Sequence, residues 1–167
     1  MIKKLYSVSY LRNFVFGVED SLVSTVGLLS GIAVANVPKS TILLTGIILL
    51  FVEAFSMAAG SFLSESSADE YTNQNDKITR TTIISSIIMF LSYLLSGFIV
   101  LFPYIVFATP EALKISIVLS AVSLFILGII GAKISNINPI KNGFRMMIVG
   151  GVAIAAGSLA GNLLNKI

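Results

Sequence analysis

Five apolar runs, each close to the length needed to cross a lipid bilayer, constrain the fold of this chain more than any other feature. They cover roughly residues 14–35, 41–64, 81–102, 112–132 and 144–164. About 20 apolar residues in a helix span a bilayer core, and turn-forming segments such as Asn36-Val37-Pro38 and Thr109-Pro110 separate the runs. The runs lack the alternation of a transmembrane barrel. The sequence therefore predicts an all-α, polytopic membrane protein with five transmembrane helices in a single membrane domain, residues 1–167.

The composition indicates that lipid is the solvent of this chain. Only 11% of its 167 residues are charged and 56% are hydrophobic, whereas a soluble domain is about 25% charged. The absence of Cys and His excludes thiolate and imidazole metal ligands and removes the commonest general base. The net charge of +3 forms no basic block along a helix face. We therefore expect no enzyme activity, no permanently bound cofactor and no nucleic-acid partner.

The basic residues are unevenly divided between the two sides of the predicted membrane domain. Eight of the eleven fall on the side that holds the N-terminus and the second-to-third and fourth-to-fifth connections: Lys3, Lys4, Arg12, Lys77, Arg80, Lys133, Lys141 and Arg145. Cytoplasmic connections of membrane proteins are enriched in Lys and Arg. This bias predicts a cytoplasmic N-terminus and an outside C-terminus, and we expect the chain to reside in the cell membrane.

Three carboxylates interrupt the first two apolar runs. Glu19 and Asp20 lie within the first run and Glu53 within the second. A carboxylate at membrane depth costs at least ~2.5 kcal/mol on insertion scales. If the two runs form an antiparallel helical hairpin, Asp20 lies level with the residue after Glu53, and Met57 follows one turn along the same face. Two carboxylates and a thioether can therefore meet at one level in the lipid.

This set of donor atoms points to divalent-metal transport. Carboxylate oxygens bind hard cations, and a thioether adds a soft donor that Mg²⁺ and Ca²⁺ do not favour. The set favours Fe²⁺, with Mn²⁺ as a second candidate, and the same carboxylates take up protons when the metal leaves. Each residue also has a structural alternative. Met57 alone is more often a packing residue, Glu19 can extend to the interface or pair with Arg12, and Asp20 and Glu53 can pair with other structural groups.

Small residues recur at helical spacing in the first and fifth runs. Ser24, Gly27 and Gly31 form one stripe, and Gly157 and Gly161 form another. Small side chains allow helices in lipid to approach closely. We expect the stripe of the first run, which shares its helix with the acids, to form the seam of a homodimer. For the fifth run, packing within the chain is the favoured interpretation.

A second acidic group follows the second run on the predicted cytoplasmic side. Glu65, Asp69 and Glu70 would lie together if the helix continued past the membrane. In that case they would gather divalent cations at the cytoplasmic entrance of a transport pathway. The alternative, which the polar composition of this segment favours, is a solvated turn without a binding role.

Several segments, taken in order along the chain, resemble the vacuolar iron transporter family. Phe16–Thr25 (FGVEDSLVST) is similar to the signature of its first helix, and Ser56–Ser64 (SMAAGSFLS) to the signature of its second. Further similarity lies at Pro103-Tyr104, Leu124–Gly128 and Arg145–Gly151. The resemblance implies a five-helix homodimer that exports Fe²⁺ or Mn²⁺ from the cytoplasm in exchange for protons. It also implies that Asp20 and Met57 line the ion path between the protomers.

The sequence departs from the family pattern in several places. Ser21 follows Asp20 where the family usually has glycine, and Gly60-Ser61-Phe62 stands where many members have Gly-Glu-Tyr. A further acid of the second helix is replaced by Leu49, with Glu53 nearby, and the connection to the third run is too short for the metal-binding insert of the eukaryotic members. A different class of function stays open on this evidence: a non-transporting scaffold or subunit of a larger membrane complex.

Overall fold

The computed structural model describes residues 2–73 and 78–164, with side chains described for 8–72 and 78–163. All regular structure in these ranges is helical. The helices are α1 (Ile2–Val34), α2 (Lys39–Asn73), α3 (Arg80–Val106), α4 (Thr109–Ser135) and α5 (Pro139–Leu164). Each contains a stretch long and apolar enough to cross a membrane. The predicted fold class, an all-α protein with five membrane-length helices, is confirmed.

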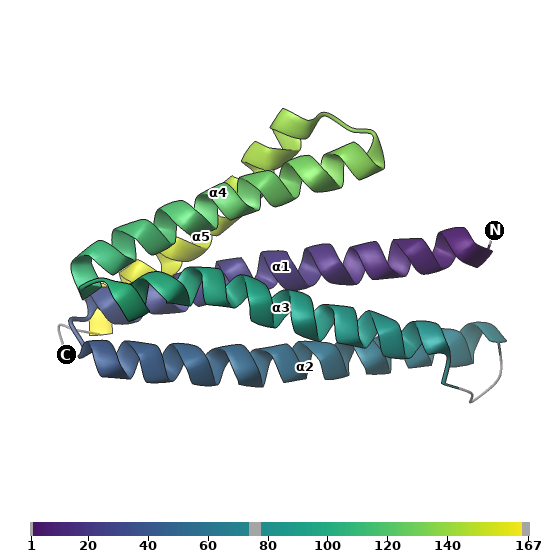
Figure 1. The fold of residues 1–167 in the computed structure, drawn as a ribbon, viewed down its shortest axis with the longest axis horizontal. Helices are drawn as coiled ribbons and strands as arrows, with labels where there is room; N and C mark the ends of the chain where they lie inside the picture. The colour runs from purple at the N-terminus through teal and green to yellow at the C-terminus, as the bar shows by residue number, and fades with distance from the viewer. Residues whose placement is uncertain (1, 74–77, 165–167) are drawn as a thin grey trace.

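The helices run up and down, so that successive connections alternate between the two ends of the bundle (Figure 1). The start of α1, the end of α2, the start of α3 and the α4–α5 turn lie at one end, which we call the N-terminal end. Although α1 and α2 are consecutive, they touch each other little; α2 packs mainly against α3, whereas α1 packs equally against α3 and α5. α3 lies between α1 and α2, and Gly97 of α3 permits this close packing. A Cβ atom at Gly97 would overlap Leu50 of α2 and lie 2.7 Å from the Ser21 hydroxyl of α1.

The interior of the bundle combines an apolar core with buried hydroxyl groups, and its outer faces are also apolar, as expected when lipid surrounds it. Hydroxyl groups of α3 and α4 are buried and donate to helix carbonyls, for example Ser96 to Ser92 at 2.6 Å and Ser116 to Val100 at 2.9 Å. The outward faces carry large apolar residues; Phe55 of α2 is 71% exposed. These hydroxyls donate to backbone carbonyls of their own or a neighbouring helix, whereas the buried hydroxyls of Thr25, Ser30 and Tyr104 have no partner among the described residues.

Glycine-to-backbone contact joins α1 to α5. A Cβ atom at Gly31 would lie 2.6 Å from the carbonyl oxygen of Gly157, and one at Gly161 would overlap the carbonyl oxygen of Gly31. The homodimer seam expected at Gly27 and Gly31 is therefore corrected: α5 of the same chain occupies this face. The physical reason is that the stripe of α5 offers the same close approach within one molecule.

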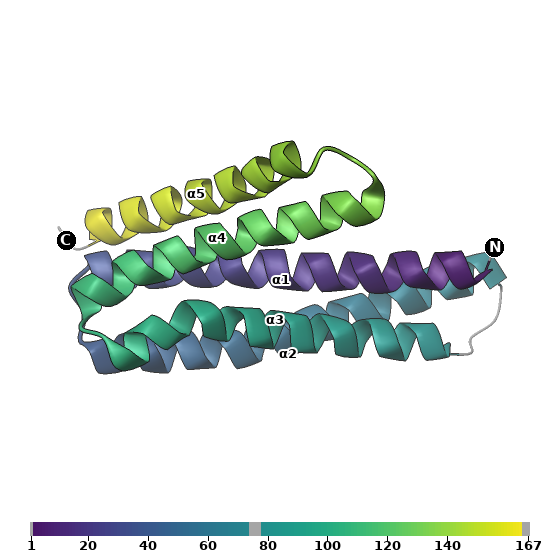
Figure 2. The ribbon, with the colours of Figure 1, turned by 45° about the horizontal axis from the view of Figure 1, so that its top comes forward.

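The α4–α5 hairpin is tightly closed at its turn. A Cβ atom at Gly128 would lie 2.6 Å from the Cα of Gly143, and the Phe125 and Phe144 rings pack edge to face with centroids 5.2 Å apart. The hairpin packs on α1 near the opposite end of the bundle and diverges from α1 towards the N-terminal end (Figures 1 and 2). This divergence creates the space in which the candidate site lies.

Candidate functional site

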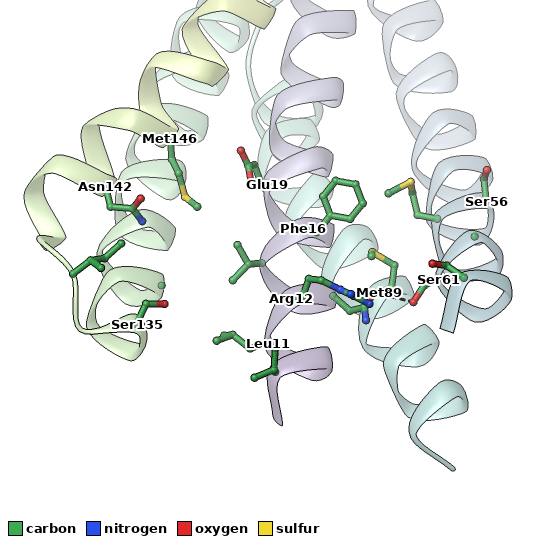
Figure 3. Close-up of a pocket in the computed structure, with 18 residues that line it drawn as sticks. Leu11, Arg12, Phe16, Glu19, Ser56, Ser61, Met89, Ser135, Asn142 and Met146 are labelled. Carbon is green, nitrogen blue, oxygen red and sulfur yellow. Dashed lines mark hydrogen bonds between the residues drawn. The ribbon is translucent and has the colours of Figure 1, made fainter. Parts of the chain in front are cut away.

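A cavity of about 1000 Å³ opens at the N-terminal end, where α1 faces both α2 and the α4–α5 hairpin (Figure 3). Most of its lining is apolar. Its side chains with a charge, a polar group or a sulfur atom are Arg12, Asn13, Glu19, Ser56, Met57, Ser61, Ser64, Met89, Ser135, Asn142 and Met146. A mostly apolar concavity with a small number of polar groups is the usual form of a small-ligand site.

Glu19 faces this cavity from α1. The side chain is partly buried, and among the described side chains it has neither an ion-pair nor a hydrogen-bond partner. The alternative in which Glu19 pairs with Arg12 is corrected, because Arg12 forms its ion pair with Glu65 of α2. Glu19 is therefore an uncompensated carboxylate in a mostly apolar space, which is an unfavourable arrangement unless a cation or proton accompanies it.

Asp20 and Glu53 lie close enough for their charges to interact, one on α1 and the other on α2. Both are partly buried, and within the described residues neither carboxylate has an ion-pair or hydrogen-bond partner. Met57, one turn along α2 from Glu53, contacts the apolar core and lines the same cavity as Glu19. Asp20 and Glu53 thus lie near each other on α1 and α2, and Met57 and Glu19 line one cavity; that the four residues form a metal pathway stays a prediction.

Tyr93 of α3 is a fourth polar residue at this level, and the sequence did not single it out. Its hydroxyl lies 2.8 Å from the Ser24 hydroxyl, and its backbone carbonyl accepts a hydrogen bond from Ser21 at 2.6 Å. The side chain is fully buried, and its hydroxyl lies within electrostatic reach of both Asp20 and Glu53. Ser24 thus serves a contact with α3 in place of the expected dimer seam. A lone tyrosine in an apolar run gives no signal of these partners.

A hydrogen-bonded network centred on Glu65 ties α1 to α2 beside the cavity. The Glu65 carboxylate accepts from Ser9 and Arg12 and, at 3.4 Å, from the Asn13 amide. The Asn13 carbonyl oxygen accepts from the Ser61 hydroxyl at 2.8 Å. Arg12, Asn13 and Ser61 also line the cavity. The charge of Glu65 is therefore compensated by the protein itself, unlike the charges of Glu19, Asp20 and Glu53.

The other two acids of the expected cation entrance have separate partners. Asp69 accepts from the hydroxyls of Thr79 at 2.8 Å and Thr82 at 3.2 Å, at the start of α3, and Glu70 accepts from Ser66 at 3.2 Å. The favoured interpretation of a solvated turn is wrong, because α2 continues as a helix to Asn73. Within the described residues no group of three or more acidic side chains could hold a metal ion together, so a joint cation entrance at these three acids stays a prediction without structural support.

These observations define a class: a five-helix integral membrane protein whose interior holds several carboxylates without protein counter-charges. The chain belongs to the VIT family, whose model matches residues 11–84 and 75–162. The predicted family resemblance is thereby confirmed.

Two curated proteins illustrate the relationship. Vacuolar iron transporter homolog 4 from Arabidopsis thaliana is 29% identical over 162 residues, which cover 87% of this chain and 79% of that protein. Vacuolar iron transporter 1 from Tulipa gesneriana is 31% identical over 83 residues, 50% of this chain and 34% of that protein. The first relationship extends over nearly all of the helical bundle.

Proposed function

We propose that this protein transports a divalent metal ion, Fe²⁺ and also Mn²⁺, through the bundle in exchange for protons. The observation that carries the proposal is the pair Asp20 and Glu53, two interacting carboxylates inside the membrane-length helices without a protein counter-charge in the described residues. The names of the two relatives, vacuolar iron transporter homolog 4 and vacuolar iron transporter 1, support the same class of cargo.

The proposed exchange follows from the electrostatics of this pair. Two negative charges in a membrane interior repel each other and lose their hydration, so a free energy cost persists until something positive neutralises them. A divalent cation neutralises both carboxylates at once, and protons neutralise them one at a time. Binding of the metal therefore displaces protons, and release of the metal allows protons to return.

The donor atoms favour Fe²⁺ among the common divalent cations. The two carboxylates supply oxygen ligands, and the Met57 thioether adds a sulfur donor that Mg²⁺ and Ca²⁺ disfavour. The chain has no Cys and no His, so it lacks the ligands with which proteins usually retain Zn²⁺ or Cu²⁺ tightly. Weak, mixed coordination suits a cation that must leave again.

We also infer export from the cytoplasm by a homodimer. The cavity opens at the end that carries most of the basic residues, which is the expected cytoplasmic side. Because α1 and α2 touch little, the open face of the cavity beside them offers a surface that a second copy can cover. Burial of the uncompensated Glu19 at such an interface would shield a cation path from lipid. Residence in the cell membrane stays a prediction, and the named relatives are vacuolar iron transporters.

Flux measurements in proteoliposomes test the proposed transport. Purified protein should move Fe²⁺ and Mn²⁺ into or out of vesicles when a pH gradient is applied, and Asp20→Asn and Glu53→Gln should each reduce the rate at least about tenfold. Glu111→Gln is the matched control, because Glu111 is an exposed carboxylate in the first turn of α4. Absence of flux with wild-type protein, or equal flux with Asp20→Asn and Glu111→Gln, would overturn the proposal.

A further inference from the structure

The fifth helix contributes donor atoms to the cavity on the side opposite α2. Met146 and Asn142 line the cavity from α5, and Glu19 lines it from α1. In Figure 3 the side chains of Glu19 and Met146 project into the space between their two helices. The pair Asp20 and Glu53, by contrast, lies outside the lining of this space.

Asn142 is held in one orientation by the hairpin. Its side-chain nitrogen donates to the carbonyl oxygen of Gly128 at 2.8 Å, which leaves the side-chain oxygen as an unused acceptor beside the cavity. The neighbouring Gly143 packs against Phe125, where a Cβ atom would lie 2.8 Å from the ring. The α5 donors are therefore attached to a rigid turn, and a ligand site benefits from such preorganisation.

We propose that Glu19, Met146 and Asn142 form a second cation position, distinct from the position at Asp20, Glu53 and Met57, which prefers Fe²⁺ over Mn²⁺. This inference rests on the proposed transport function and deepens it by assigning cation selectivity to α5. The cavity between α1 and α5 offers one carboxylate without a protein counter-charge among the described residues, one thioether and one fixed amide oxygen.

The chemistry of the donors explains the preference. The carboxylate supplies attraction for any divalent cation, whereas the thioether discriminates, because a soft donor stabilises Fe²⁺ more than Mn²⁺. A single carboxylate, unlike a chelating pair, binds weakly enough to release its cation. With two successive binding positions, a cation that binds at one position repels the cation at the other and promotes its release, as in multi-site conduction.

Met146→Leu tests the selectivity assignment, because leucine keeps the side-chain volume and removes the sulfur. Met147→Leu is the matched control: Met147 is the adjacent residue on α5 and does not line the cavity. Met146→Leu should lower the Fe²⁺-to-Mn²⁺ flux ratio about tenfold, comparable to loss of an outer partner at a metal site. Met147→Leu should keep the wild-type ratio, and an unchanged ratio in Met146→Leu would overturn the inference.

A binding measurement separates failure of this site from failure of the transport proposal. The Asp20→Asn substitution weakens the first position, so anaerobic equilibrium dialysis of this variant with Fe²⁺ measures binding at the second position. Asp20→Asn should bind Fe²⁺, and the double variant Asp20→Asn/Glu19→Gln should not. Equal binding by the two variants would overturn the second position whether or not the wild-type protein transports, whereas absent wild-type flux with intact Glu19-dependent binding would overturn transport alone.

Discussion

Substitution of Gly31 by alanine tests the packing of α1 on α5 quantitatively. The new Cβ atom would lie 2.6 Å from the Gly157 carbonyl oxygen, whereas ordinary van der Waals contact begins near 3.4 Å. The obstacle is backbone, so the two helices must separate by several tenths of an ångström. Overpacking of this kind costs about 1–3 kcal/mol, and we take the upper value because a backbone atom cannot rotate away. Alanine regains up to ~1 kcal/mol of helix propensity, which leaves a net loss of about 2 kcal/mol.

Thermal unfolding in detergent micelles measures this loss. A free energy change of about 2 kcal/mol lowers the Tm of a chain of this size by roughly 4–8 °C. Gly151→Ala is the control on α5, because nothing lies within 4 Å of a Cβ atom there, and its Tm should stay equal or rise. If Gly31→Ala melted at or above Gly151→Ala, or changed only the oligomeric state, the intramolecular assignment of this seam would be refuted.

Two further predictions concern polar groups around the site. Tyr93→Phe removes the hydroxyl that lies 2.8 Å from the Ser24 hydroxyl. It should reduce the free energy of unfolding by about 1 kcal/mol and change the pH dependence of Mn²⁺ flux. An unchanged pH profile would exclude Tyr93 from proton transfer. Glu65→Gln should destabilise the protein more than Arg12→Gln, since the Glu65 side chain is 15% exposed and the Arg12 side chain 64%. An exposed ion pair contributes only about 0–1 kcal/mol, so equal Tm losses in these two variants would contradict the central role of the Glu65 carboxylate in this network.

The helices were predictable because lipid leaves the backbone few choices. Every peptide group in hydrocarbon must be bonded internally, so five long apolar runs dictate five helices. Their ends were less predictable. α2 continues through Glu65 and Asp69 to Asn73. Hydropathy does not predict this end, because the end of a helix beyond the apolar run is determined by specific hydrogen bonds. The bond from Thr79 to Asp69 is a tertiary contact that connects two helices across the end of the bundle.

The sequence predicted that two of the acids lie near each other, and it did not predict their neighbours. Counting along an antiparallel hairpin brings Asp20 and Glu53 to one level, and the two carboxylates lie within electrostatic range of each other. The count does not reveal that α3 fills the gap between α1 and α2 and places Tyr93 beside the acids. Likewise, a stripe of glycines predicts that another helix packs closely, but it does not identify which helix. Met146 lines the cavity because the α4–α5 hairpin diverges from α1. The spacing of apolar residues does not predict this divergence.

Proton release on metal binding tests the central claim most directly. Mn²⁺ added anaerobically to wild-type protein in weakly buffered detergent solution should release protons, because the cation displaces them from Asp20 and Glu53. The double variant Asp20→Asn/Glu53→Gln should release few protons, and Glu111→Gln should match the wild type. Equal proton release by the double variant and the wild type would contradict the claim that these two carboxylates hold the transported cation.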